Sequence, residues 1–233
     1  MWMKKSFGKA DKELRLTRFE KFDAPFESAY VHAGDLHVPG DWTGGDLLRA
    51  CGHDPGSRYL GACTMFVVDG DLTVDGTLDL DAGVNESIGL SVTGRLHAGV
   101  VDVDATMLFV FGGAEVKQLI NFTTTDGTIS IAGTTECPLV IYDEGDLNLA
   151  STGHILCRRD NGPAEAPAPG DASEDDDEDP GWGWPRTTLT RTEVPDALVE
   201  GLYDEHHWVD SRLALALARA GKPLLRPAYV RHA

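Results

Sequence analysis

The chain has 233 residues, and its apolar content of 42% is enough for a buried core. With 38 acidic and 20 basic residues it carries a formal charge of −18 at pH 7. Because nucleic acids and anionic membranes both require clustered Lys and Arg, this charge argues against both as partners and favours a basic protein partner. The N-terminal residues lack the apolar region of a secretory signal, and the four cysteines lack CxxC spacing, which is typical of reduced thiols in a cytoplasmic protein.

Residues 1–57 are mixed in charge and are predicted to form a short N-terminal capping segment. The stretch DKELRLTRFEKF fits either a helical turn or an edge strand, and its periodicity does not decide between them. A short helix is expected within GDWTGGDLLRACGHD, with Thr43 or Asp46 as its N-cap and Gly52 at its end.

Residues 58–157 consist of short β-type segments that alternate apolar and polar residues. A glycine recurs at a similar position in successive segments, with intervals of 24, 18 and 21 residues between Gly70, Gly94, Gly112 and Gly133. A quasi-period near 20 predicts a mainly β fold, a single-stranded parallel β-helix (solenoid) of about four to five rungs. A β-sandwich or barrel built from the same strands is the alternative. The predicted inward residues are Phe66, Val68, Leu72, Val74, Leu78, Leu80, Leu90, Val92, Leu96, Val101, Val103, Leu108, Val110, Val116, Leu119, Phe122, Ile129, Ile131, Leu139 and Ile141.

Residues 158–183 are rich in Pro, Ala, Gly and acidic residues, with nine acidic and no basic residues between positions 160 and 180. This composition predicts an acidic disordered loop. Residues 184–233 are periodic again and predict a C-terminal helical appendage packed on the solenoid. Pro195 suits a first helical turn, and a second helix is expected to begin at Asp210 or Ser211 and end at Gly221.

The acidic series Asp69, Asp71, Asp75, Asp79 and Asp81 matches neither an EF-hand loop nor the GGxGxD repeat of calcium-binding β-rolls. We therefore expect these residues to line the solvent side of the strands, where they would steer a basic partner, and we expect no metal. Trp182 and Trp184 follow the acidic loop and are candidate anchors for that partner.

Motifs for catalysis are missing from the chain. The eight histidines show no HExxH or HxxxH spacing, and no GxSxG motif is present. These observations predict a protein that is not an enzyme and needs no cofactor. A polysaccharide-acting β-helix enzyme with two close carboxylates remains a third possibility for the function.

The segment FVVDGDLTVDGTLDL resembles the bactofilins, a family of polymer-forming cytoskeletal proteins, and so do the similar segments SVTGRLHAG and SIAGTTE further along the chain. That resemblance implies a β-helix that self-assembles into a scaffold. The same sequence pattern, VVDGDLTVDG followed by LSVTGRLHA, also resembles immunity proteins of bacterial polymorphic toxin systems. This second resemblance implies a non-enzymatic cytoplasmic protein that binds a cognate toxin and occludes its active site.

The immunity function is the one that we expect, with the bactofilin-like scaffold as the alternative. The acidity of the chain suits a basic toxin, such as a nuclease. A homodimer is also compatible with the sequence.

Overall fold

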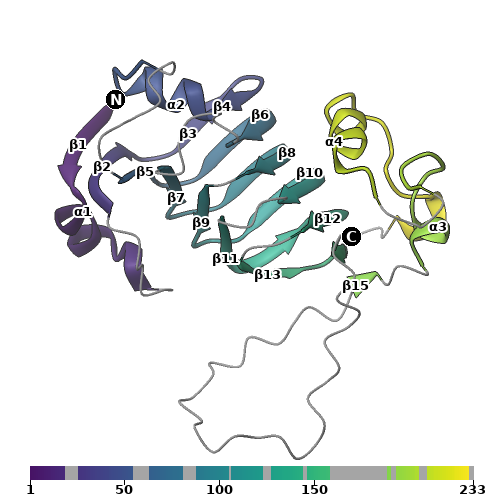
Figure 1. The fold of residues 1–233 in the computed structure, drawn as a ribbon. Coiled ribbons are helices and arrows are strands. Elements are labelled where there is room, and N and C mark those ends of the chain that lie inside the picture. The colour runs from purple at the N-terminus through teal and green to yellow at the C-terminus, as the bar shows by residue number, and fades with distance from the viewer. Residues whose placement is uncertain are drawn as a thin grey trace, which may run out of the picture.

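The computed structural model describes residues 1–18, 26–54, 63–80, 88–104, 106–122, 127–143, 146–157, 188–189, 193–204 and 209–230. Within these residues, fifteen strands form one hydrogen-bonded sheet. Two rows of parallel strands run through it, and they lie opposite each other in Figure 1. The prediction for the 158–183 loop lies outside the described residues.

The first row contains β2 (Phe26–Ala33), β5 (Cys63–Asp69), β7 (Ile88–Val92), β9 (Met107–Val110), β11 (Thr128–Glu136) and β13 (Asp146–Ser151). The second row contains β3 (Leu36–Val38), β4 (Trp42–Thr43), β6 (Leu72–Asp79), β8 (Leu96–Val103), β10 (Ala114–Phe122), β12 (Leu139–Tyr142), β14 (His154–Cys157) and β15 (Thr188–Leu189). Strand β1 (Trp2–Ser6) adds antiparallel to β2.

The predicted β-helix of stacked rungs is wrong. Strand β10 pairs not only with β8 and β12 of its own row but also with β11 of the other row, through Ala114 with Thr135 and Glu115 with Glu136. This pairing joins the two rows, and with the antiparallel β1 the result is a mixed, open, curled sheet of mostly parallel strands. The period of the sequence predicts strands that repeat, but it carries no information on the hydrogen bonds that connect one row with the next.

The main hydrophobic core lies inside the curl of the sheet. Most of the predicted inward residues are buried in this core, from Phe66 on β5 to Ile131 on β11. Leu119, Leu139 and Ile141 are the exceptions, because they belong to a second cluster on the outer side of β8 to β15. For Leu119 the reason is the alternation along β10, because Val116, Ile120 and Phe122 at even positions face the main core and Leu119 at an odd position faces the other side.

The glycine corners of the sequence stack directly on one another. A Cβ atom at Gly94 would come within 2.7 Å of the backbone of Gly70, and one at Gly112 within 2.6 Å of the backbone of Gly94. Gly34 lies on the other side of Gly70, and Gly133 lies against Gly112 and Gly113. This glycine column (Gly34, Gly70, Gly94, Gly112, Gly133) brings successive strands to hydrogen-bonding distance at the turn, where larger residues would separate them.

Helices lie near the N-terminal end of the sheet, one on its outer side and one whose Leu47 and Leu48 enter the main core. Helix α1 (Phe7–Leu14), followed by the 3-10 turn η1 (Leu16–Arg18), packs on β2 at the N-terminal end. Helix α2 (Gly44–Ala50) begins with a capping box between Thr43 and Asp46, which confirms the predicted N-cap. The described helices include none that is long and apolar enough to cross a membrane.

The C-terminal segment holds α3 (Val194–Ala197), α4 (Ser211–Arg219) and the 3-10 turn η2 (Pro227–Tyr229). It lies at the opposite end of the sheet from β1 (Figure 1). Its apolar residues cover the second cluster, which contains Leu119, Leu139 and Ile141. Asp210 caps α4 by accepting a hydrogen bond from the backbone of Leu213, and Gly221 follows the helix with a φ of +67°, both as predicted.

Candidate functional site: the polar face

One stretch of the outer surface of the sheet carries only polar side chains. We call it the polar face and define it by His37, Thr73, Asp75, Arg95, His97, Glu115, Lys117 and Glu136. Six of these residues alternate along β3, β6, β8 and β10 with core residues such as Leu72, Val74 and Val116, which turns them outward. Arg95 directly precedes β8, and Glu136 is the last residue of β11. Asp75, Glu115 and Lys117 are exposed, because the described helices pack on other parts of the sheet.

The strand register places five of these side chains in one row. His37 pairs with Thr73, Thr73 with His97 and His97 with Glu115. Glu115 in turn pairs with Glu136 of β11. Neighbouring strands of a sheet lie about 4.8 Å apart, so the row crosses the strands at that spacing.

Each carboxylate of the polar face has a basic partner. The His37 ring Nε2 donates to Asp75 Oδ1 at 2.9 Å, and the His97 ring Nδ1 donates to Glu115 Oε2 at 3.2 Å. A guanidinium nitrogen of Arg95 lies 3.7 Å from Glu136 Oε1. All six side chains are at least 36% exposed, so each pair contributes at most about 1 kcal/mol to stability. The pairs orient the carboxylates without using up their capacity to bind other groups.

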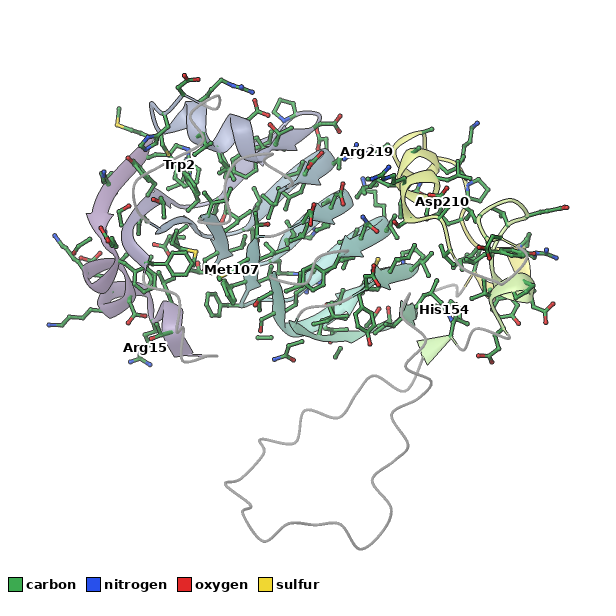
Figure 2. The ribbon with its side chains drawn as sticks, viewed as in Figure 1. Trp2, Arg15, Met107, His154, Asp210 and Arg219 are labelled. Carbon is green, nitrogen blue, oxygen red and sulfur yellow. The ribbon has the colours of Figure 1, made fainter. Side chains whose placement is uncertain are left out.

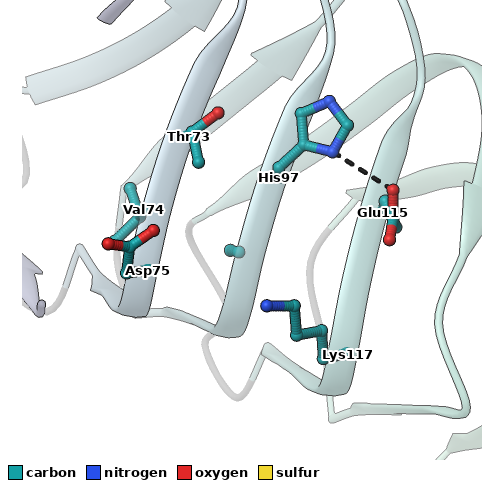
Figure 3. A pocket seen from close by; sticks show the side chains of 7 residues that line it. Thr73, Val74, Asp75, His97, Glu115 and Lys117 are labelled. Carbon is teal, nitrogen blue, oxygen red and sulfur yellow. Dashed lines mark hydrogen bonds and ion pairs between the residues drawn. The ribbon is translucent and has the colours of Figure 1, made fainter. Parts of the chain in front are cut away.

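A shallow groove of about 340 Å³ runs across this face. Thr73 and Asp75 of β6 line one side, His97 of β8 lies in the middle, and Glu115 and Lys117 of β10 line the other (Figure 3). Val74 and Ala98 complete the lining. The groove is open to solvent along its length. It therefore suits a side chain presented by another molecule better than a small substrate, which proteins usually enclose.

The described residues contain no group of three or more His, Cys, Asp or Glu that is placed to hold a metal ion. The two His–carboxylate pairs of the polar face belong to separate strand pairs, so they do not converge on one point. The arrangement therefore provides charges and hydrogen-bonding groups in a fixed pattern, which is what recognition of another molecule requires.

Two of the predicted acidic residues hold turns of the chain. The Thr93 hydroxyl donates to Asp69 Oδ1 at 3.2 Å. The backbone N–H of Arg95 donates to Asp71 Oδ1 at 2.7 Å, and in the same way the N–H of Asp71 donates to Asp35. Asp71 and Asp35 stabilise the corners beside the glycine column, because each accepts from a backbone N–H that the turn leaves unpaired, and Asp69 links its corner to the side chain of Thr93.

The other predicted site residues lie in different places. Asp79 binds Arg219 of α4 at 2.7 Å, away from the polar face. Asp75 alone of the predicted aspartates is part of that face. Asp81, Trp182 and Trp184 lie outside the described residues.

The sequence does contain a signal for the residues that were not predicted. Each member of the row lies three positions after a glycine of the column: His37 after Gly34, Thr73 after Gly70, His97 after Gly94, Glu115 after Gly112 and Glu136 after Gly133. Counting from the glycines would therefore have identified the row.

Comparison of the chain with protein-family models, with curated proteins and with solved structures gave no match.

Proposed function

We propose that this protein is a non-enzymatic binding protein that receives a basic protein partner on its polar face. The function is that of a cytoplasmic immunity protein, which neutralises a cognate toxin by covering the toxin's active site. The observation that supports it is the exposure of Asp75, Glu115 and Glu136 on one uncovered face, in a chain with a charge of −18.

The rigidity of the backbone favours binding at this face. The carboxylates project from β6, β10 and β11, which lie in one sheet. The glycine column and the aspartates at the corners hold these strands at fixed spacing. A surface that does not have to be ordered on binding loses less conformational entropy, and more of the contact energy then appears as affinity.

The pairing of the carboxylates also suits a basic partner. Each histidine donates one hydrogen bond to Asp75 or Glu115, whereas an arginine offers a permanent positive charge and two parallel hydrogen bonds. A partner's arginine in the groove is therefore able to replace the histidine as the stronger ligand. We expect such side chains to lie between β6 and β10, where Asp75 and Glu115 flank His97.

The ends of the sheet favour this function over a self-assembling scaffold. Lysines lie on the edge strand β1, which discourages pairing between identical edges. The C-terminal segment covers the apolar outer side of β8 to β15. The lysines oppose end-to-end stacking of copies through β1, and the C-terminal segment closes an apolar face to lateral contact between copies.

The test takes the C-terminal domain of the protein encoded directly upstream as the candidate toxin domain and measures the survival of bacteria that express it. Co-expression of the wild-type protein is expected to restore growth. The triple variant Asp75→Lys/Glu115→Lys/Glu136→Lys is expected to fail, because it reverses the charge of the polar face. The matched control changes three exposed carboxylates elsewhere, Glu27→Lys/Asp196→Lys/Glu200→Lys, and should still protect.

Each result has a separate meaning. Loss of protection by both triple variants would show that total charge matters and the polar face does not. No protection by the wild-type protein, with the toxin domain shown to be active, would contradict the immunity function. Circular dichroism of both variants establishes that they remain folded.

A further inference from the structure

The N-terminal end of the molecule has the opposite charge from the rest. Residues 1–18 contain six basic and two acidic residues, a net charge of +4, which leaves −22 for the other residues of the chain. These residues form β1, α1 and η1, which lie together at one end of the curled sheet (Figure 1). The charge of the molecule is therefore divided along its length.

This basic end contains an open strand edge. Strand β1 pairs with β2 through all five of its residues, from Trp2 with His32 to Ser6 with Ser28. It is the first strand in the order of the sheet, and no other described strand pairs with it. Alternate backbone N–H and C=O groups of β1 consequently point away from β2 and are available to another strand.

Basic side chains lie on β1 itself and on α1, which follows β1 and packs on the outer side of β2. Lys4 on β1 and Lys9, Lys12 and Arg15 on or next to α1 are exposed, and none of them forms an ion pair with a described carboxylate. Figure 2 places Arg15 at the α1 end of this group and Trp2 at the other, where its ring packs toward the core. Lys4 also lies with its Nζ 5.5 Å from the centre of the Tyr30 ring.

The chain already places one carboxylate among these cations. Glu13 of α1 forms an ion pair with Lys5 of β1. The pKa of Glu13 is lowered, chiefly by the hydrogen bond from Lys5 and further by the charges of Lys5 and Lys9. The space beside β1 therefore favours a negatively charged group.

We propose that the free edge of β1 binds an extended acidic segment of another protein, which adds to the sheet as a further strand. Backbone hydrogen bonds to β1 provide the affinity, and Lys4, Lys9 and Lys12 select acidic side chains. The charges disfavour a second copy of β1 as the occupant, because lysines would then face lysines. The open edge favours a polypeptide over nucleic acid or lipid, since neither of these uses an edge of unpaired peptide groups.

This interaction goes beyond the proposed function. The polar face consists of residues of β3, β6, β8, β10 and β11 and would bind a basic partner. The β1 edge lies at the N-terminal end and would bind an acidic one. A test with a short peptide does not depend on the identity of either partner.

The probe is a fluorescein-labelled octapeptide of alternating Thr and Glu, and fluorescence anisotropy at low salt measures its binding to the full chain. We expect a dissociation constant in the micromolar range, roughly 1–100 μM, as for other short strands added at an edge. The matching Thr–Lys octapeptide should not bind. A Thr–Glu octapeptide with N-methyl groups at alternate residues keeps its charge but loses its hydrogen bonds along one edge, and it should bind about tenfold more weakly or worse.

Variants of the protein complete the test. Lys9→Glu/Lys12→Glu is expected to weaken binding of the Thr–Glu peptide by about tenfold. Arg212→Glu/Lys222→Glu makes the same change in charge in the C-terminal segment and should leave binding unchanged. Equal affinity for the N-methylated and unmethylated peptides would overturn the proposal, because binding would then depend on charge alone. Failure of the Thr–Glu peptide to bind would also overturn it, including the case in which heparin or vesicles with anionic lipid bind instead.

Discussion

Arg219 of α4 donates a hydrogen bond of 3.1 Å to Asp102 of β8, across 117 positions of the chain. The Asp102 side chain is only 9% exposed, and its other oxygen accepts a hydrogen bond of 2.8 Å from the Asn121 amide. The same guanidinium also binds Asp79. Arg219 thus ties the C-terminal segment to two strands of the sheet.

Replacing Arg219 should loosen this attachment. In Arg219→Ala, the nearly buried carboxylate of Asp102 loses its hydrogen bond from the guanidinium and keeps the one from the Asn121 amide, so we expect the free energy of unfolding to fall by about 1–3 kcal/mol. Urea denaturation measures the change. Arg212→Ala removes an exposed arginine from the same helix and should change stability by less than about 0.5 kcal/mol. Equal effects of the two substitutions would show that the contacts of Arg219 with the sheet carry little energy.

Four glycines of the column, Gly70, Gly94, Gly112 and Gly133, should tolerate no side chain, because a Cβ at each would lie within 3.0 Å of backbone atoms. A Cβ at Gly94 would lie 2.1 Å from Asp71 Oδ1 and 2.7 Å from the backbone of Gly70. Since backbone atoms cannot move aside easily, we expect Gly94→Ala to cost about 3 kcal/mol or more. Gly8 is the control, because it lies in α1 with nothing within 4 Å of its Cβ position. Gly8→Ala should raise the melting temperature slightly, since alanine favours a helix over glycine.

The capping box of α2 should make stability depend on pH. The pKa of Asp46 is lowered, first by the hydrogen bond from the Thr43 hydroxyl and then by that from Arg49. A carboxyl group whose pKa is lower in the folded state stabilises the fold above its unfolded pKa, about 3.9, and loses this effect as the pH falls through the folded pKa. We expect Asp46→Ala to lower the free energy of unfolding by about 1 kcal/mol at pH 7 and by much less near pH 2.

Urea denaturation at both pH values measures the contribution of this cap. Glu200→Ala, an exposed carboxylate outside any cap, should have little effect at either pH. A loss of stability in Asp46→Ala that is as large near pH 2 as at pH 7 would contradict the role assigned to the ionised carboxylate.

Two cysteines should be unreactive in the folded protein. Burial raises the pKa of the Cys51 thiol and of the Cys137 thiol to about 12. The thiolate is the reactive form, so in the variant Cys63→Ser/Cys157→Ser we expect iodoacetamide to modify these two cysteines at pH 8 at least about 100-fold more slowly than free glutathione. Mass spectrometry follows the reaction, and addition of urea should restore ordinary rates. Rapid alkylation without urea would show that the thiols are accessible in the native state.

Local features of the fold were predictable because they depend on neighbouring residues. Thr43 and Asp210 cap their helices, and Gly221 follows α4 with positive φ, because capping and turn chemistry act within a few positions. The repeat of Gly70, Gly94 and Gly112 likewise identified the corners, since close contact between turns requires a residue without a Cβ.

Features that depend on contacts between distant residues were not predictable in the same way. The run LVIY of β12 is apolar on both sides, so it does not reveal that Val140 faces the main core while Leu139 and Ile141 face the C-terminal segment. The period of the sequence also does not indicate that β10 pairs with β11, the pairing that makes one open sheet.

The acidic residues show the same limit for the candidate site. Asp69, Asp71 and Asp75 are alike in the sequence, but the first two accept hydrogen bonds at corners and the third lies on the polar face. Asp79 has its partner in α4, 140 positions further along the chain.

The glycine column also keeps the exposed row in register, although the connections between its strands differ in length. Its glycines are 36, 24, 18 and 21 residues apart, yet the residue three positions after each one stays in register with the next. Insertions and deletions in the connections are therefore expected to leave the alignment of His37, Thr73, His97, Glu115 and Glu136 intact. Under the proposed function, a change of binding specificity would require only substitutions at these outward positions, on a backbone that other residues keep in place.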